Sequence, residues 1–292
     1  MFIATLVADG LATGQLSEAS DRLAGAGCAP GAWRWLDAGR AADLEFRTHA
    51  DLARGALEGA FPATDVIVQP SQGREKKLLV ADMDSTMITV ECIDELADYA
   101  GIKAHIAEVT ERAMRGELDF GAALDARVAL LKDLDEAAID LCLAERVRDS
   151  VGAEVLVKTM AARGATTVLV SGGFTRFAGP VGERLGFQRV IANVLEIGAG
   201  RLTGLVTKPI VDSATKETTL LAVREELGLT PDQTLAVGDG ANDLAMIRQA
   251  GLGVAYRAKP IVAAAAAARV DHTDLTTLLY AQDIARSEWV DA

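Results

Sequence analysis

Short apolar runs and longer amphipathic stretches alternate along most of the chain after residue 75. The amphipathic stretches carry apolar residues at helical spacing, as in Val155–Arg163 and Arg176–Leu185. The apolar runs suit buried strands and are Leu78–Ala81, Thr167–Val170, Leu235–Val237 and Gly251–Ala255. Strands that alternate with helices predict a parallel sheet, with ligands bound at the carboxyl ends of its strands.

The first seventy residues follow a different pattern. Two amphipathic stretches, Leu16–Leu23 and His49–Gly59, predict helices. Four shorter runs predict strands, namely Met1–Ala8, Trp33–Leu36, Asp43–Thr48 and Asp65–Gln69. This order of strands and helices is that of a ferredoxin-like unit. The polar stretch Pro70–Lys77, with its proline and glycine, predicts a linker, so we expect domains at residues 1–72 and 73–292.

A helical insert interrupts the larger domain after its first strand. Four amphipathic helices are expected, at Cys92–Ala100, Lys103–Arg115, Phe120–Lys132 and Glu136–Arg146, and they predict a cap at about residues 91–150. Further along, Val190–Val194 and Arg201–Val206 frame a glycine-rich turn and predict a hairpin. The expected fold class is α/β: a Rossmann-like parallel sheet with a helical cap, plus an N-terminal α+β ferredoxin-like domain.

Composition narrows the function classes. Half of the 292 residues are hydrophobic, and the net charge of −13 argues against a nucleic-acid partner and means that an anionic substrate needs local cations. No apolar run reaches the roughly 18 residues of a membrane span. The first ten residues lack the basic region of a signal peptide. The three cysteines are widely spaced and match no metal spacing, which predicts reduced, buried thiols in a cytoplasmic protein. The lack of an apolar span predicts that the protein has no membrane partner.

Two carboxylates, Asp82 and Asp84, come directly after the buried run Leu78–Ala81. Carboxylates this close repel one another, and removing each from water costs several kcal/mol, roughly. A hard divalent cation relieves both problems, because such ions take oxygen ligands. Taken alone, the motif also fits a solvated, aspartate-rich turn.

Two further polar clusters follow predicted strands. Ser171-Gly172-Gly173 offers a hydroxyl and backbone N–H groups, which suit an anion. The segment Gly238–Asp243 again places carboxylates at a strand end. Lys216 begins a helix, where it opposes the helix dipole, and this position favours a negative charge nearby. Each feature alone is weak, but three polar clusters at one sheet edge predict a single site.

In this order, the segments Asp82–Thr86, Ser171–Gly173, Lys216 and Gly238–Asp243 resemble the four motifs of the haloacid-dehalogenase-like phosphatases. Within that superfamily the chain is most similar to the phosphoserine phosphatases, a likeness carried by Glu91, Arg112–Phe120 and Arg127. The resemblance covers about residues 75–290. The N-terminal segment resembles an ACT-like domain, a weaker likeness.

The resemblance implies Mg²⁺-dependent hydrolysis of O-phospho-L-serine to L-serine and phosphate, the last step of serine biosynthesis. It implies that Asp82 is the nucleophile, which forms an aspartyl-phosphate, and that Asp84 is the general acid and base. It places Mg²⁺ on Asp82, the backbone carbonyl of Asp84, and Asp239.

The resemblance also assigns the substrate contacts. Ser171, Gly172 and Lys216 are expected to bind the phosphoryl oxygens. Around them, Asn242 would contact the phosphate side or Lys216, and Asp243 would orient Lys216 or the metal-bound waters. At the serine end, we expect Glu91 to bind the ammonium and Arg127 the carboxylate, since arginine can bind a carboxylate through two hydrogen bonds. Met114 and Phe120 of the cap would exclude water.

Two other functions compete with this hypothesis. The first is an enzyme of the same fold that acts on another small phosphate, or that transfers the phosphate to an acceptor alcohol. The second is a regulatory amino-acid-binding module in which the N-terminal domain does the main work, and the intact catalytic set argues against this as the whole function. The resemblance leaves room for an amino-acid effector at the N-terminal domain and for a homodimer.

Overall fold

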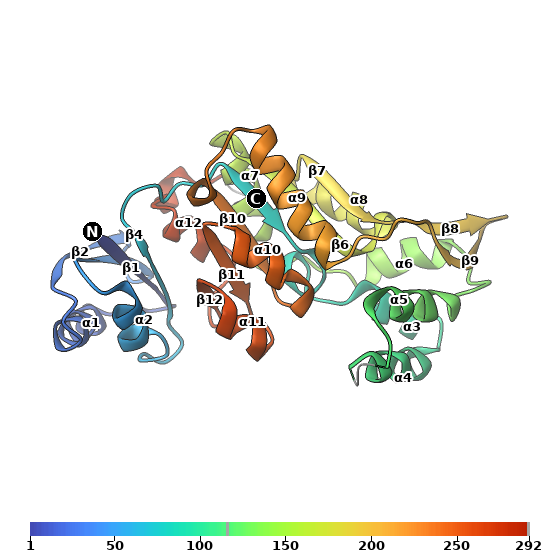
Figure 1. The fold of residues 1–292 in the computed structure, drawn as a ribbon, viewed down its shortest axis with the longest axis horizontal. Coiled ribbons are helices and arrows are strands. Elements are labelled where there is room, and N and C mark those ends of the chain that lie inside the picture. Colours follow the sequence, from blue (N-terminus) through green and yellow to red (C-terminus); the bar gives the residue numbers. More distant parts are fainter. Residues whose placement is uncertain (115–116, 291–292) are drawn as a thin grey trace.

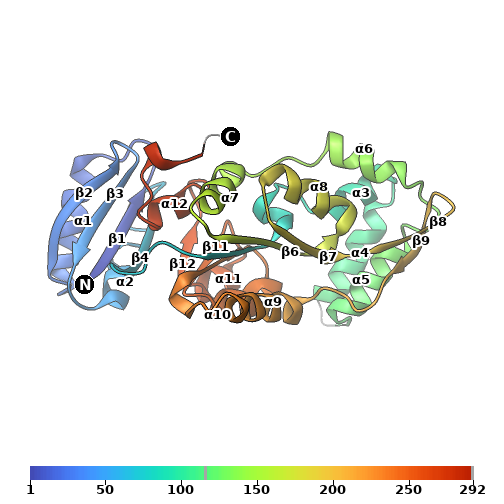
Figure 2. The same cartoon turned by 90° about the horizontal axis from the view of Figure 1, so that it is seen from above.

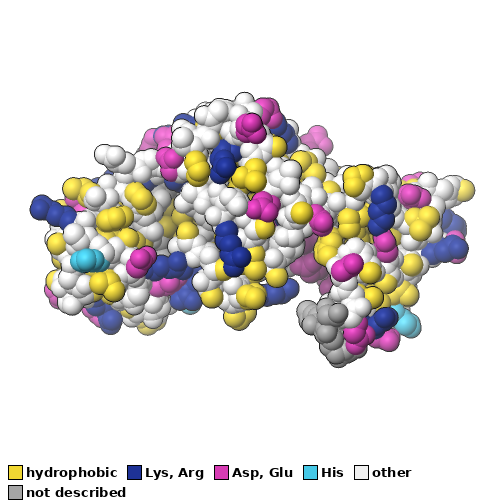
Figure 3. Space-filling view, in the orientation of Figure 1, with side chains coloured by type: hydrophobic (Ala, Val, Ile, Leu, Met, Phe, Trp, Pro, Cys, Tyr) yellow, Lys and Arg dark blue, Asp and Glu magenta, His cyan; other side chains and the backbone are white. Residues whose placement is uncertain are grey.

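The structure is a computed structural model that describes residues 1–114 and 117–290, except for the side chains of Glu111, Ala113 and Met114. A small N-terminal unit packs on one side of a larger α/β unit, and a group of helices stands at the other end (Figures 1 and 2). Figure 3 shows acidic and basic side chains interspersed over one face of the molecule. Within the described part of the chain, no helix has the length and apolar character needed to cross a bilayer.

The N-terminal unit is a four-stranded antiparallel sheet covered by two helices. The strand order is β2-β3-β1-β4, with bounds β1 (Phe2–Val7), β2 (Pro30–Asp37), β3 (Ala41–Phe46) and β4 (Asp65–Pro70). One face packs on α1 (Thr13–Gly25) and α2 (Ala50–Leu57), through side chains such as Leu6, Leu16 and Leu57. The other face meets the larger unit, where Val7 packs on Tyr280. The predicted ferredoxin-like order of elements is therefore confirmed.

A six-stranded parallel sheet forms the centre of the larger unit. Its order is β12-β11-β10-β5-β6-β7. The strands are β5 (Leu78–Ala81), β6 (Thr166–Phe174), β7 (Arg189–Asn193), β10 (Thr234–Gly238), β11 (Leu252–Tyr256) and β12 (Ala268–Val270). Ala81 of β5 pairs with Leu169 of β6 and with Val237 of β10, so the polar residues that follow these strands lie at one edge. This register confirms the predicted parallel sheet.

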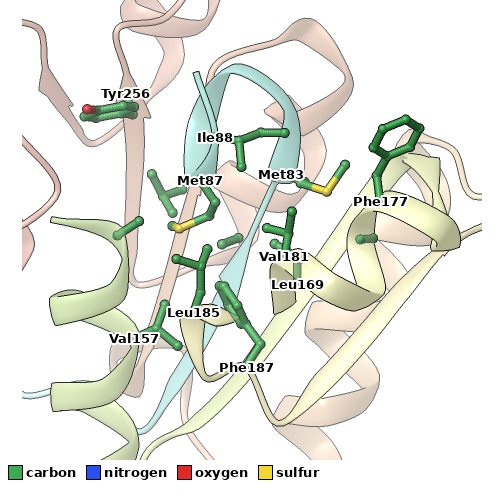
Figure 4. Close-up of a cluster of buried hydrophobic side chains, with 14 of the residues drawn as sticks. Met83, Met87, Ile88, Val157, Leu169, Phe177, Val181, Leu185, Phe187 and Tyr256 are labelled. Carbon is green, nitrogen blue, oxygen red and sulfur yellow. The ribbon is translucent and has the colours of Figure 1, made fainter. Parts of the chain in front are cut away.

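Helices cover both faces of this sheet, which explains the continuous apolar runs in its strands. On one face, Leu79 and Ala81 join a cluster with α7 (Ala153–Ala162) and α8 (Thr175–Leu185), part of which is drawn in Figure 4. On the other face, Leu78 and Val80 pack with α9 (Ser213–Glu226) and α10 (Leu244–Gln249). Two shorter helices, α11 (Pro260–Ala265) and α12 (Thr277–Ala281), complete the unit.

The cap consists of α3 (Cys92–Tyr99), α4 (Lys103–Met114), α5 (Phe120–Ala129) and α6 (Ala137–Glu145). Its two connections to the core pair with each other. Thr89 N–H donates to the Arg148 carbonyl at 2.9 Å, and Ser150 N–H donates to the Met87 carbonyl at 2.9 Å. We propose residues 91–150 as the cap, because this short two-stranded connection is where it could hinge.

The predicted hairpin is wrong in one of its strands. Arg201–Val206 forms β9 as expected, but its partner is β8 (Leu195–Gly198), not Val190–Val194. The turn is made by Ala199 and Gly200, with φ of 51° and 76°, values typical of a tight hairpin turn. The segment assigned to the hairpin is largely β7, which pairs with β6 as the edge of the parallel sheet.

The segment Pro70–Lys77, which we predicted to be a linker, is partly buried between the N-terminal sheet and the larger unit. Arg74 and Lys76 are buried, with 6% and 5% of their surfaces exposed. Arg74 donates to Asp43 at 2.6 Å and to the carbonyls of Tyr280 and Ala281 at 2.9 Å. The segment therefore joins the N-terminal sheet to the larger unit through a buried ion pair. We keep 1–72 and 73–292 as the proposed domain units.

All three cysteines, Cys28, Cys92 and Cys142, are buried and free of disulfides, as predicted.

The Arg74–Asp43 ion pair generates a stability prediction. Arg74→Met leaves Asp43 without its buried partner, and a broken buried pair costs about 3–5 kcal/mol. Arg34→Met is the matched control, since Arg34 also binds Asp43, at 2.9 Å, but its side chain is 54% exposed. The free energy of unfolding of this control should fall by less than about 1 kcal/mol. Urea unfolding followed by circular dichroism measures both, and equal losses would contradict a structural role for the buried pair.

Candidate active site

The predicted site residues meet at the carboxyl edge of the parallel sheet. A cavity of about 100 Å³ is lined by Asp82, Asp84, Glu91, Ser171, Gly172, Asp239, Gly240, Asn242 and Lys259. A second hollow of about 70 Å³ shares Asp84, Glu91 and Gly172 with the first, and it adds Phe120 and Arg127 from the cap. Residues as far apart in the sequence as Asp82 and Lys259 are thus brought together in two adjoining hollows.

Asp82 continues β5 by one residue into this cavity. Its N–H donates to the Val237 carbonyl at 3.0 Å, which extends the parallel ladder beyond the strand. Its carboxylate accepts from Met83 N–H at 2.8 Å and lies 2.6 Å from Lys216 Nζ. The side chain is only 6% exposed, so it is held in one position at the floor of the cavity.

Lys216 is fully buried, between two carboxylates. Its Nζ lies 2.6 Å from Asp82 and donates to Asp243 at 2.7 Å. Burial alone would lower the pKa of Lys216, but Asp82 and Asp243 outweigh burial and raise this pKa, so the ammonium stays charged. Negative charge is therefore present near this first-turn lysine, as expected. The contact of Asp243 with Lys216 is compatible with one of the two roles that the resemblance implies for Asp243.

Glycines allow the loop after β10 to fold tightly around Asp243. The second oxygen of Asp243 accepts from Gly240 N–H at 3.0 Å. A Cβ added at Gly238 would lie 2.4 Å from that same oxygen, a distance that no side chain tolerates. A glycine is thus required at 238 because the Asp243 carboxylate takes the space of a side chain.

The turn Met83–Met87 carries Asp84 and is anchored in the core below. Met83 and Met87 are fully buried and lie among core side chains such as Val181 (Figure 4). Ser85 adopts a left-handed conformation with φ of 53°, which is strained for a residue with a side chain and recurs at functional sites. The hydroxyl of Ser85 donates to Glu91 at 2.7 Å. The turn therefore fixes Asp84 and Glu91 together.

Asp84 is a carboxyl group that titrates near neutrality. Burial and the nearby Glu91 raise its pKa to about 7, although Asp84 accepts a long hydrogen bond from Cys92 N–H at 3.4 Å. Gly173 leaves room for it, since a Cβ there would lie 2.9 Å from the second Asp84 oxygen. A group with this pKa can both donate and accept a proton near neutral pH.

Asp239 completes a concentration of negative charge. It accepts from the Thr86 hydroxyl at 3.3 Å, and burial, Asp243 and Glu91 together raise its pKa to about 6. Carboxylate oxygens of Asp82, Asp239 and Asp243 all lie within 4.8 Å of one another. Lys216 offsets the charge of Asp82 and Asp243 by direct contact, and Lys259 acts on Asp239 only electrostatically, without a direct ion pair. The donor set fits a hard divalent cation, with Asp239 as the carboxylate least engaged by protein donors.

The Ser171–Gly173 loop is held by Asn193, a residue that the sequence analysis missed. The buried Asn193 amide donates to the Gly172 carbonyl at 2.8 Å and to the Val211 carbonyl at 3.2 Å, and it accepts from Val211 N–H at 2.7 Å. Ser171 Oγ accepts from Gly173 N–H at 2.9 Å. The available signal was a polar residue at the end of β7, the same position that marks the other clusters.

Arg127 and Phe120 project from α5 of the cap into the second hollow. Burial lowers the pKa of Arg127, while Asp94, Glu91 and Asp84 oppose this effect. Among the side chains that the structure describes, no carboxylate lies within ion-pair distance of Arg127, whose Nε donates only to the Ala123 carbonyl at 3.3 Å. Phe120 reaches over Gly172, where an added Cβ would lie 3.2 Å from its ring. The side chain of Met114, also assigned to this wall, is outside the described residues.

The comparisons with known proteins agree with this site. Residues 79–248 match the family of haloacid dehalogenase-like hydrolases. A phosphoserine phosphatase of Streptomyces coelicolor is 46% identical over 80% of this chain and 57% of its own length. One of Albidiferax ferrireducens is 46% identical over 70% of this chain and 88% of its own length. The chain thus spans just over half of the Streptomyces relative and most of the second one.

Solved structures extend the likeness to the whole fold. A probable phosphoserine phosphatase from Vibrio cholerae has a TM-score of 0.78 and 34% identity, and the alignment covers 98% of this chain and 88% of that one. A phospho-aspartyl intermediate analogue of phosphoserine phosphatase has a TM-score of 0.65 and 37% identity over 70% of this chain and 98% of that one. On this evidence, the chain belongs to the family of haloacid dehalogenase-like hydrolases.

Proposed function

We propose that this protein hydrolyses O-phospho-L-serine to L-serine and phosphate, the reaction that ends serine biosynthesis. The observation that carries the proposal is the junction of two hollows around Asp84. One contains Asp82, with Lys216 behind it, and the other contains Arg127, while Asp84 and Glu91 line both. Relatives named as phosphoserine phosphatases, which are 46% identical to this chain, support the same substrate.

Asp82 is the proposed nucleophile. A carboxylate oxygen of Asp82 attacks phosphorus and forms an aspartyl-phosphate, while the bond from phosphorus to the serine oxygen breaks. Asp84 gives its proton to that leaving oxygen, which its pKa of about 7 allows. In the second half, Asp84 takes a proton from the water that attacks phosphorus, and Asp82 is released as a carboxylate.

The phosphoryl oxygens are bound by the groups around Asp82. We infer that the Ser171 hydroxyl, the Gly172 N–H and the Lys216 ammonium stabilise charge on these oxygens during transfer, with Asn242 beside them. Asp243 keeps Lys216 oriented through their 2.7 Å contact. Ser171 and Gly172 line the cavity of Asp82, and Lys216 lies directly behind Asp82, so a phosphoryl group bound at Asp82 would be close to all three.

Mg²⁺ is the proposed cofactor, held by carboxylates of Asp82 and Asp239 and by the backbone carbonyl of Asp84. When bound, the ion would neutralise the repulsion between these carboxylates and the phosphate. Burial first, and neighbouring carboxylates second, raise the pKa values of Asp84 and Asp239, and a bound cation would favour the charged form of both groups.

The second hollow is the proposed serine end of the substrate. Glu91 pairs with the substrate ammonium, and Arg127 binds its carboxylate through two parallel hydrogen bonds. Arg127 is partly buried and lacks an ion-pair partner among the described residues, as a group that awaits an anion would. Phe120 and Met114 are proposed to exclude water above the bond that breaks.

Three accompanying proposals rest on the family resemblance. A cytoplasmic location suits the free, buried cysteines. An amino-acid effector of the N-terminal unit and a homodimer remain predictions.

Asp82→Asn should lose at least about 10³-fold in phosphoserine turnover, because the amide is not a nucleophile of comparable strength. A phosphate-release assay measures this loss, with deamidation excluded by intact mass. Asp51→Asn, at an exposed position on α2, should keep its activity and serves as the control. Full turnover by Asp82→Asn would contradict the nucleophile assignment.

Arg127→Ala should reduce kcat/KM for phosphoserine about 100-fold and that for p-nitrophenyl phosphate less than about tenfold, since only phosphoserine has a carboxylate to lose. Arg146→Ala, an exposed change on the same cap, should affect neither substrate. If Arg127→Ala reduces kcat/KM by the same factor for both substrates, the enzyme acts on another small phosphate.

Removal of divalent ions by a chelator should abolish turnover, and added Mg²⁺ should restore it. Mg²⁺ should also raise the Tm of the unmodified protein, because it binds only the folded state. Asp239→Asn should remove most of that rise, whereas Asp51→Asn should leave it intact. Undiminished turnover in excess chelator would contradict a metal requirement.

A further inference from the structure

We propose that Lys259 is an additional substrate-binding residue, whose ammonium group engages the phosphate at the mouth of the cavity. This inference rests on the proposed phosphatase function and deepens it. Lys259 lines the same cavity as Asp82, Ser171 and Asn242. It lies outside the four sequence motifs, which is why the sequence analysis did not select it.

The backbone holds Lys259 at the rim although its side chain is exposed. The residue follows β11, so it comes from the same sheet edge as the other site residues. Its N–H donates to the Asp239 carbonyl at 3.1 Å, and its own carbonyl accepts from Val262 N–H at 2.9 Å at the start of α11. The base of the side chain is therefore tied to the loop that carries Asp239, while the ammonium can move toward a ligand.

The lining of the cavity is mostly acidic, so a phosphate that enters it needs a nearby positive charge, which Lys259 can supply. The acidic groups of the lining are Asp82, Asp84, Glu91 and Asp239, and Lys259 is its one basic side chain. Lys216 lies beneath Asp82 and is already engaged by two carboxylates. In the part of the chain that the structure describes, no carboxylate is within ion-pair distance of Lys259, although its charge acts on Asp239 over a longer distance and opposes the rise in the pKa of Asp239. An ammonium that is free to move and has three donors suits phosphate oxygens arriving from different directions.

The position of Lys259 also separates its effect from that of Arg127. Lys259 lines the cavity of Asp82 but not the hollow that contains Arg127. It should therefore contact the phosphate, which all substrates share, and not the group that leaves. A solvated surface lysine, the plainer alternative, would change neither substrate affinity nor phosphate binding.

The test compares Lys259→Ala and Lys259→Arg with Lys132→Ala, which removes the same charge from an exposed cap position that lines neither hollow. In Lys259→Ala we expect KM to rise roughly tenfold for both phosphoserine and p-nitrophenyl phosphate, with kcat changed less than twofold. The inhibition constant of inorganic phosphate should rise by the same factor. Lys259→Arg should bring both KM values and the inhibition constant of phosphate most of the way back to those of the unmodified protein. Lys132→Ala should leave all of these constants unchanged.

Ionic strength and direct binding supply two further readouts. The salt dependence of kcat/KM should weaken in Lys259→Ala, because a charge that attracts the substrate has been removed. Calorimetry with inorganic phosphate, in the presence of Mg²⁺, should show the same loss of affinity without any turnover.

The outcomes distinguish this inference from the proposed function. Unchanged KM and unchanged phosphate affinity in Lys259→Ala would overturn it. A fall in kcat that extra Mg²⁺ cures, with phosphate affinity intact, would also overturn it, because Lys259 would then act through Asp239. If the unmodified protein were inactive on phosphoserine, the substrate proposal would fail, while the aryl phosphate and calorimetry would still decide the role of Lys259.

Discussion

The buried contact of Lys216 with Asp82 and Asp243 is the interaction on which the rest of the site depends. Each ion alone would be costly to bury, by several kcal/mol, roughly, so none of the three is stable there without the others. The contact joins three elements that are distant in the sequence: the end of β5, the first turn of α9 and the loop after β10. It also fixes one oxygen of Asp82 at 2.6 Å from an ammonium and leaves the carboxylate at the cavity wall. A carboxylate held in this way is oriented before any substrate binds, as the proposed role of Asp82 as nucleophile requires.

The parallel sheet makes this arrangement possible, and the cap carries Arg127, the residue proposed to give the site its selectivity. Because β5, β6 and β10 are paired in register, the residues that follow them reach the same edge. The cap is attached at that edge by two paired connections, and α5 carries Arg127 over the site. The N-terminal unit lies at the opposite end of the molecule (Figure 2), joined through the buried Arg74–Asp43 pair. The proposed catalytic residues at the sheet edge, the cap that carries Arg127, and the N-terminal ACT-like unit therefore occupy separate parts of the molecule.

Much of this could be predicted from the sequence, because the strands are short continuous apolar runs and the proposed catalytic residues directly follow them. The residues that the sequence analysis missed act through distant partners. Asn193 holds the Ser171 loop only because β7 lies beside β6, and Lys259 reaches the cavity only because β11 lies beside β10. Arg74 looked like part of a polar linker, since nothing local shows that Asp43 and the Tyr280 carbonyl surround it. The hairpin was assigned to the wrong strand for a similar reason. Nothing local in the sequence shows that β7 pairs with β6 in the parallel sheet and leaves β8 as the partner of β9.

The central claim is that Asp82 carries the phosphoryl group during turnover, and trapping that group tests it most directly. Borohydride added during turnover reduces an aspartyl-phosphate to homoserine, which mass spectrometry can locate in a peptide. The account predicts homoserine at position 82, formed only when phosphoserine is present. Modification at Asp84 or Asp239 instead, or active turnover with no trapped residue at position 82, would contradict it.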